Sequence, residues 1–150
     1  MRLLMLLVLL FPVLSFGSPE SDKRFFEEQQ VLAEQGNASA QFNLARMYDY
    51  GQGIPKDGKE AVKWYRKAAD QGYVNAQLNL GVMYDNGEGV PTDDKEAVKW
   101  YRLAADQGDA LSQHNLGLMY NNGRGVPEDN LLAYMWTNIA GANGYDVEEN

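Results

Sequence analysis

The sequence of 150 residues has no cysteine and a single histidine, His114. Without cysteine the chain can form neither a disulfide nor a lipidated cysteine, so an exported form would depend on packing alone for its stability. One histidine with no cysteine cannot build a zinc site. The acidic segment 85–88 lacks the ligand spacing of a calcium loop, so no metal or other cofactor is expected.

Basic residues are few relative to acidic ones. The sequence contains 13 Lys and Arg against 21 Asp and Glu, which gives a formal net charge of −8. Nucleic acids and anionic lipid surfaces repel a protein of this charge, so neither is expected as a partner. The glycine-rich segment Gly51-Gln52-Gly53 and its later copies do not follow a strand, which argues against a phosphate-binding loop.

Only one long apolar run occurs, from Leu3 to Leu14, with Arg2 before it and Ser15-Phe16-Gly17 after it. This order is typical of a secretory signal peptide over residues 1–17, cleaved most simply after Gly17. The run is shorter than the roughly 20 residues that a membrane-spanning helix needs, so an uncleaved anchor is the weaker alternative. We expect an exported protein, periplasmic or secreted, with no stable membrane insertion after cleavage.

The sequence does contain a repeat of 36 residues. Residues 72–107 are identical to residues 36–71 at 24 of 36 positions and to residues 108–143 at 16. A fixed period of this length indicates one supersecondary unit stacked on its neighbours. We expect repeats over residues 36–71, 72–107 and 108–144, followed by a tail at 145–150.

Each repeat is expected to be a pair of antiparallel helices. In the first repeat the apolar stripe of the first helix consists of Ala40, Leu44, Met47 and Tyr48, and that of the second helix of Ala61, Trp64, Tyr65, Ala68 and Ala69. Both sets follow the period of a helix with one buried face. Small residues on the first helices, Ala45, Gly81 and Gly117, leave room for the large rings of a facing helix.

The connection inside each repeat has its own signals. Gly51 and Gly53 allow positive φ at the end of the first helix, and Pro55 prevents its continuation. Asp57, and its copies Asp93 and Asp129, are expected to cap the second helix, with Glu60 three residues later as in a capping box. On the exposed face of this helix we expect an ion pair between Arg66 and Asp70.

The motifs Leu-Gly-x-Met-Tyr, Gly-x-Gly-Val-Pro-x-Asp and Ala-Val-x-Trp-Tyr-x-x-Ala-Ala recur in order, and with them residues 36–144 resemble the Sel-1-like repeat family, which is related to tetratricopeptide repeats. The resemblance implies a right-handed α-solenoid that binds other proteins and has no activity in the repeats. Some exported relatives have been linked to hydrolysis of cell-wall peptides or β-lactams. Those relatives are cysteine-rich, so a hydrolase is the alternative function.

Residues 18–35 are expected to form a short mobile lead, 18–22, and an N-terminal capping helix. Residues 23–35 align with the second helix of a repeat, so that Phe25 stands at the position of Ala61 and Leu32 at that of Ala68. Polar side chains crowd this segment, as in the terminal helix of a solenoid. Phe25 and Phe26 are expected to cover the end of the stack.

Two surfaces are candidates for partner binding. The first is the back of the first helices, where the residues vary between copies: Phe42, Arg46, Leu78, Val82, His114 and Leu118. This face either packs against the next repeat or forms a groove for a peptide. His114 aligns with Phe42 and Leu78, which favours a packing or groove residue over a catalytic base, and Ser112 faces another direction on the same helix.

The second surface is the second helix of the third repeat. Leu131, Met135 and Ile139 replace the lysines at 59, 63 and 67, which makes this helix apolar almost all round. Three explanations remain open: a homodimer through this face, a partner protein that covers it, or a chain that ends earlier than its relatives. The sequence thus predicts a non-enzymatic scaffold or adaptor for a protein or peptide, or a structural cap within an envelope complex.

Overall fold

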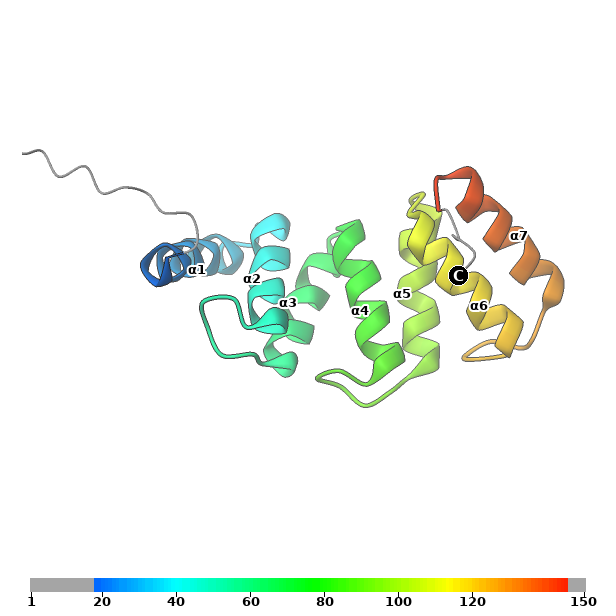
Figure 1. Ribbon diagram of the computed structural model, residues 1–150, viewed down its shortest axis with the longest axis horizontal. Helices are drawn as coiled ribbons and strands as arrows, with labels where there is room; N and C mark the ends of the chain where they lie inside the picture. The colour runs from blue at the N-terminus through cyan, green and yellow to red at the C-terminus, as the bar shows by residue number, and fades with distance from the viewer. Residues whose placement is uncertain (1–17, 146–150) are drawn as a thin grey trace, which may run out of the picture.

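The computed structural model describes residues 18–145, and all of the regular secondary structure in these residues is α-helical (Figure 1). Its seven helices are α1 (Pro19–Glu34), α2 (Ala38–Tyr50), α3 (Gly58–Asp70), α4 (Val74–Asn86), α5 (Asp94–Asp106), α6 (Ala110–Asn122) and α7 (Asn130–Ala142). They lie in one row along the long axis, and each packs against its neighbours in sequence. The predicted all-α solenoid is confirmed. The predicted signal peptide, 1–17, and residues 146–150 of the predicted tail lie outside the described residues.

The helices form pairs α2–α3, α4–α5 and α6–α7, and α1 precedes them without a partner of its own. The first helix of each pair ends at a glycine in the left-handed conformation, as predicted: φ is 69° at Gly51, 74° at Gly87 and 63° at Gly123. The second glycine of each turn has a further role that the sequence did not reveal. A Cβ at Gly89 would lie 2.2 Å from the carbonyl oxygen of Gly58, at the start of α3. The turn of one repeat therefore packs directly against the preceding repeat.

Aspartates cap the second helices as predicted. The Asp57 carboxylate accepts hydrogen bonds from the backbone N–H groups of Lys59 and Glu60, at 3.0 and 3.1 Å, and Asp93 and Asp129 do the same in their repeats. The predicted capping box forms only by half, because the Glu60 carboxylate does not bond back to the Asp57 N–H. The Asp57 N–H donates to the Tyr48 carbonyl oxygen at 2.8 Å, and the Glu60 carboxylate instead accepts from Lys63 Nζ at 3.1 Å.

The predicted mobile lead is wrong, because α1 begins at Pro19. Ser18 caps it by accepting a hydrogen bond from the Ser21 N–H at 3.2 Å, and proline suits the first turn, where its missing N–H would have no helical partner. Phe26 packs edge-on against Tyr48, with ring centroids 5.9 Å apart, whereas Phe25 stays 45% exposed. One of the two phenylalanines therefore covers the stack.

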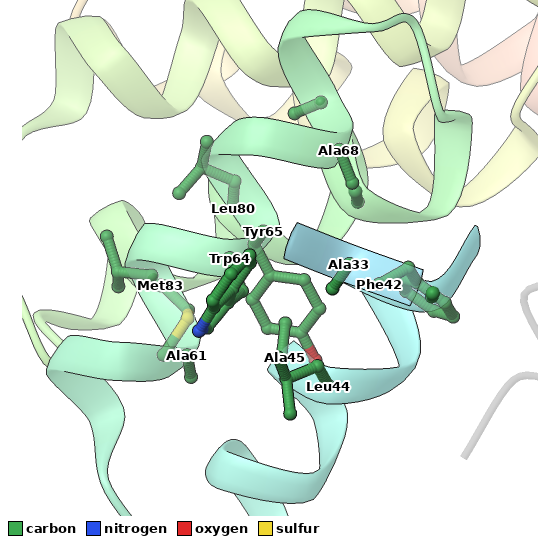
Figure 2. Packing of buried hydrophobic residues seen from close by; sticks show 14 of the residues in the cluster. Ala33, Phe42, Leu44, Ala45, Ala61, Trp64, Tyr65, Ala68, Leu80 and Met83 are labelled. Atoms are coloured by element: carbon green, nitrogen blue, oxygen red, sulfur yellow. The ribbon is translucent and has the colours of Figure 1, made fainter. Parts of the chain in front are cut away.

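The hydrophobic core runs along the row of helices and fills the space within and between repeats. Figure 2 shows the Trp64 and Tyr65 rings packed among small residues, with Ala45 and Ala61 near them. In the second repeat a Cβ at Gly81 would lie 2.7 Å from the Tyr101 ring, which confirms why this position is small. The large and small residues of facing helices are thus matched.

A buried glutamine connects three successive helices at each repeat junction. In α4, Gln77 donates to the carbonyl oxygen of Ala69 at 3.2 Å and accepts from Gln107 Nε2 at 2.8 Å. Gln41 and Gln113 make the equivalent bonds, with Ala33 as the carbonyl that Gln41 reaches. Because Ala33 lies in α1, this bond shows that α1 stands where the second helix of a repeat would stand.

Arginine contacts also link the repeats. The predicted pair between Arg66 and Asp70 is not formed, since the Arg66 guanidinium donates to the hydroxyl of Tyr84 in the next helix and lies 3.9 Å from the Glu96 carboxylate. Arg102 donates to the Tyr120 hydroxyl in the same way. These side chains therefore contact the next repeat instead of pairing with an acidic residue of their own helix.

Candidate protein-binding surface

The back of the first helices is only partly open. Phe42 is 9% exposed, because its ring packs against those of Tyr65 and Tyr73 at centroid distances of 5.8 and 5.0 Å. This burial removes Phe42 from the predicted binding residues. Leu78 and Val82 are half-buried and pack against the core of the second and third repeats.

Two of the predicted residues on this face are exposed, and α4 separates them. Arg46 in α2 lies over the Phe42 and Tyr50 rings, 5.9 Å from each centroid. Leu118 in α6 is 43% exposed. Within residues 18–145 this face therefore presents no continuous apolar groove.

His114 is a packing residue of the third repeat. Its ring stacks on that of Tyr145, with centroids 4.3 Å apart, as Phe42 packs on Tyr73 in the first repeat. Burial lowers the pKa of His114 from its ordinary value, so the imidazole is neutral at pH 7. Its Nδ1 and the hydroxyl of Ser112 are both buried without a hydrogen bond among the described residues, so the two side chains do not form a nucleophile–base pair.

Replacing Ser112 by alanine is expected to stabilise the protein by about 1 kcal/mol. The Ser112 hydroxyl is fully buried and unpaired, and the other repeats have Ala40 and Ala76 at this position. Urea denaturation of the wild type and Ser112→Ala would measure the difference in the free energy of unfolding. A loss of stability in the variant would show that the hydroxyl has a partner.

Helix α7 carries the largest apolar exposure among the described helices of the repeats. Leu131 is 77% exposed, Tyr134 69% and Met135 41%, while Ile139 is half-buried. No residue from Asn130 to Ala142 is charged, although 23% of the chain is. The apolar residues predicted for this helix are therefore largely on its exposed surface.

The exposure of Tyr134 follows from its place at the end of the described stack. Val62 and Val98 occupy the same position in the earlier repeats, and they are only 7% and 6% exposed. In those repeats the following repeat covers this position; Val126 of the third repeat, for example, lies beside Val98. The sequence analysis did not single out Tyr134, although the alignment of the repeats places it at the position of Val62 and Val98.

A groove between α6 and α7 joins the two predicted surfaces. It has a volume of about 390 Å³ and is lined by Gly117, Leu118, Asn121, Asn130, Ala133, Tyr134 and Thr137. Leu118 from the first surface and Tyr134 from α7 stand on its walls. The arrangement is suited to binding an apolar side chain and offers two amides at its polar end.

Other kinds of site find no support in the described part of the chain. No group of three or more His, Asp or Glu side chains within residues 18–145 lies close enough to hold a metal ion. Among the same residues, no helix combines the length and the apolar character needed to cross a bilayer.

The sequence matches the Sel1 repeat three times, over residues 38–73, 74–109 and 110–145. The chain belongs to the Sel1 repeat family. The three matched segments keep the period of 36 residues and together cover most of the described helices. Sel1 repeats typically form non-catalytic scaffolds that mediate protein interactions.

Solved structures agree with this assignment. A Sel1 repeat protein from Oxalobacter formigenes is 39% identical, with a TM-score of 0.74, over 82% of this chain and 92% of that one. A protective antigen present in uropathogenic Escherichia coli strains, which displays an SLR fold, is 38% identical with a TM-score of 0.77 over 86% of this chain. This chain spans 31% of the length of that antigen.

Cysteine rich protein B of Helicobacter pylori has a TM-score of 0.66 and is 21% identical over 85% of this chain and 92% of that one, which shows a shared fold and nothing further. A search of curated proteins finds no significant match.

Proposed function

We propose that this Sel1 repeat protein is a non-enzymatic scaffold that binds a partner protein through the exposed surface of its third repeat. The observation that carries the proposal is the charge-free helix α7, on which Leu131, Tyr134 and Met135 are exposed. An apolar patch of this kind on a soluble protein marks an interaction site more often than an unused surface. Export to the periplasm or the exterior is part of the proposal, and the signal-like sequence of residues 1–17 supports it.

Within this proposal, Leu131 and Met135 make the main contact and Ile139 and Leu118 border it. Lysine stands at the positions of Leu131 and Met135 in both earlier repeats, where it is exposed to solvent. The charge of the lysines keeps the outer face of a helix exposed to solvent, and an apolar residue at the same position lacks that charge. A binding role supplies a reason for that change.

The hydrolase alternative has no supporting observation. The Ser112 hydroxyl and His114 Nδ1 are both buried and make no hydrogen bond among the described residues. Catalysis by such a pair requires the base to reach the nucleophile and both to reach the substrate. The scaffold is therefore the function that the surface favours.

Charging the α7 surface is expected to abolish partner binding without unfolding the protein. The variant Leu131→Lys/Met135→Lys restores the residues that stand at these positions in the first two repeats, so the helix should tolerate both lysines. Quantitative pull-down from the envelope fraction should show at least a tenfold loss of the captured protein, since each lysine would have to be desolvated in an apolar contact.

The matched control is Lys59→Ala/Lys63→Ala, which changes the equivalent positions of α3 and should leave capture unchanged. Equal capture by the wild type and the α7 variant would contradict the proposed surface. The mass in solution of the wild type and of the α7 variant separates a homodimer from a different partner. A dimer that becomes a monomer in the variant would assign the surface to a second copy.

A further inference from the structure

Arg124 bridges two carboxylates at the junction between the second and third repeats. Its guanidinium donates to Asp85 and Asp94 at 2.5 and 2.6 Å, and Asp85 also accepts a hydrogen bond from the Tyr101 hydroxyl at 3.2 Å. Arg124 lies in the turn of the third repeat, directly before Gly125, and this turn packs against the backbone of Asp94. The junction thus contains a cation between two acidic side chains.

The junction between the first and second repeats has the same turn contact but no such cation. Asp49 and Gly58 stand at the positions of the two aspartates, and Glu88 stands at the position of the arginine. As at the later junction, a tyrosine hydroxyl, that of Tyr65, donates to Asp49, here at 3.4 Å. Asp49 forms no ion pair among residues 18–145. This junction therefore keeps one carboxylate of the site and lacks its positive partner.

A cavity of about 500 Å³ opens at this junction. Its lining includes Asp49, Gly58 and Glu88, which are equivalent to the three residues of the later ion pairs. Glu88 is exposed, and its carboxylate accepts a hydrogen bond from Asn86 Nδ2 at 3.3 Å, within its own turn. A Cβ at Gly58 would lie 3.0 Å from the Cα atom of Gly89. A ligand therefore has room beside Asp49 and Glu88 and not over Gly58.

The charges and the walls of this cavity favour a guanidinium group. Burial raises the pKa of Asp49 from its ordinary value, and the charge of Glu88 adds to the rise, so these two carboxylates lack a counter-charge. The buried Met83 side chain supplies an apolar part of the lining. A guanidinium is planar and more weakly hydrated than an ammonium group, so it is the cation better suited to a wall of this kind.

Two lysines also line the cavity, and neither supplies the missing cation. The charge of Lys56 lowers the pKa of Asp49, but the side chain is exposed and forms no ion pair with Asp49. Lys59 recurs as Lys95 in the second repeat, where Arg124 is bound by its two aspartates all the same. Lys56 is therefore a competitor that weakens a bound cation without replacing it.

We infer that this cavity binds the guanidinium group of an arginine side chain from another protein, beside the carboxylates of Asp49 and Glu88. The incoming arginine makes between two chains the contact that Arg124 makes within one. Arginine is enriched at protein interfaces, where a single bound side chain contributes a large share of the binding energy. The site lies between the first and second repeats, so it is separate from the α7 surface and goes beyond the function proposed for that surface.

The test is a ¹H–¹⁵N NMR titration of the folded protein with Nα-acetyl-arginine amide as the probe. We expect saturable shifts of the amide signals of Asp49, Gly58, Glu88 and Gly89, with a Kd on the order of 10 mM for so small a ligand. The citrulline analogue has nearly the same shape without the charge and should bind about fivefold more weakly. The lysine analogue should bind about twofold more weakly, because its ammonium group holds water more tightly.

The decisive variant is Glu88→Arg, which gives the second repeat the residue that the third has at this position. The position is exposed, so the fold should be kept, while the new side chain pairs with Asp49 and abolishes the probe shifts. Asp49→Asn should abolish them as well. Lys56→Thr installs the threonine of the second repeat and should tighten binding about twofold by removing the competing charge. The control Asp106→Asn removes an exposed carboxylate outside the cavity lining and should keep the shifts.

Absent or non-saturable shifts, equal binding of the citrulline analogue, or unchanged shifts in Glu88→Arg would each overturn the inference. Equal binding of the lysine analogue would overturn the assignment to arginine. Weaker binding by Lys56→Thr would overturn the site itself, since the lysine and not Asp49 would then hold the probe. None of these measurements involves α7, so their failure would leave the proposed scaffold function standing.

Discussion

The Gly89→Ala variant is expected to lose about 4 kcal/mol in the free energy of unfolding. Gly89 has φ of +71°, and a Cβ there would lie 2.2 Å from the carbonyl oxygen and 2.3 Å from the carbonyl carbon of Gly58. Both atoms belong to the backbone at the start of α3, so they cannot move aside as a flexible side chain would. Since native domains are stable by only about 5–15 kcal/mol, urea denaturation should show a large fall in the unfolding midpoint.

Gly108→Ala is the matched control for the backbone contact. Gly108 has φ of +92°, but nothing lies within 4 Å of the Cβ position. Its variant therefore suffers the conformational penalty alone, about 1–2 kcal/mol. If Gly89→Ala is no less stable than Gly108→Ala, the close packing of the turn against α3 does not exist in solution.

The contact between Gly89 and Gly58 shows which parts of the fold the sequence could predict and which it could not. The pairs of helices, the aspartate caps and the positive φ at Gly51 follow from local chemistry, and the structure confirms all three. The second role of Gly89 depends on the neighbouring repeat, which no single unit reveals. The return bond of the capping box, from Glu60, is absent for a related reason: the carbonyl oxygen of Tyr48, from the first helix, accepts the hydrogen bond from the N–H that Glu60 was expected to bind.

The binding surface was predicted less completely than the fold. The exchange of lysine for Leu131 and Met135 indicated an unusual helix, and these residues are exposed. Phe42 was wrongly assigned to the binding face because its position varies between the repeats. Such variation is expected at a binding face, but also at a junction that rings of different size fill. Tyr134 was missed, since the significance of its position depends on what covers Val98 in the second repeat.

The helical periodicity of the sequence did not predict that a glutamine is buried in each repeat. Gln41 and its copies are identical in all three repeats and lie at the edge of the apolar stripe, beside Tyr48 and its copies, where a polar side chain does not by itself indicate burial. The structure shows Gln77 to be 4% exposed and bonded to the helices on both sides. A polar side chain is buried without penalty only where its hydrogen bonds are made, so these contacts define the stacking geometry.

The Gln77→Ala variant is accordingly expected to lose about 3 kcal/mol in the free energy of unfolding, the second large effect in this chain. The variant removes the bonds to Ala69 and Gln107 and leaves a cavity at the junction of α3, α4 and α5. Chemical denaturation of the wild type and variant, followed by circular dichroism, measures the loss.

Gln107→Ala serves as the matched partner variant in a double-mutant cycle. Gln107 is exposed and bonds both Gln77 and the Gly72 carbonyl oxygen, so its removal alone should lower stability by about 1 kcal/mol. The double variant should be more stable than the sum of the single losses indicates, with a coupling of about 1 kcal/mol. A coupling near zero would mean that the two glutamines do not act together, and that apolar packing alone orders the stack.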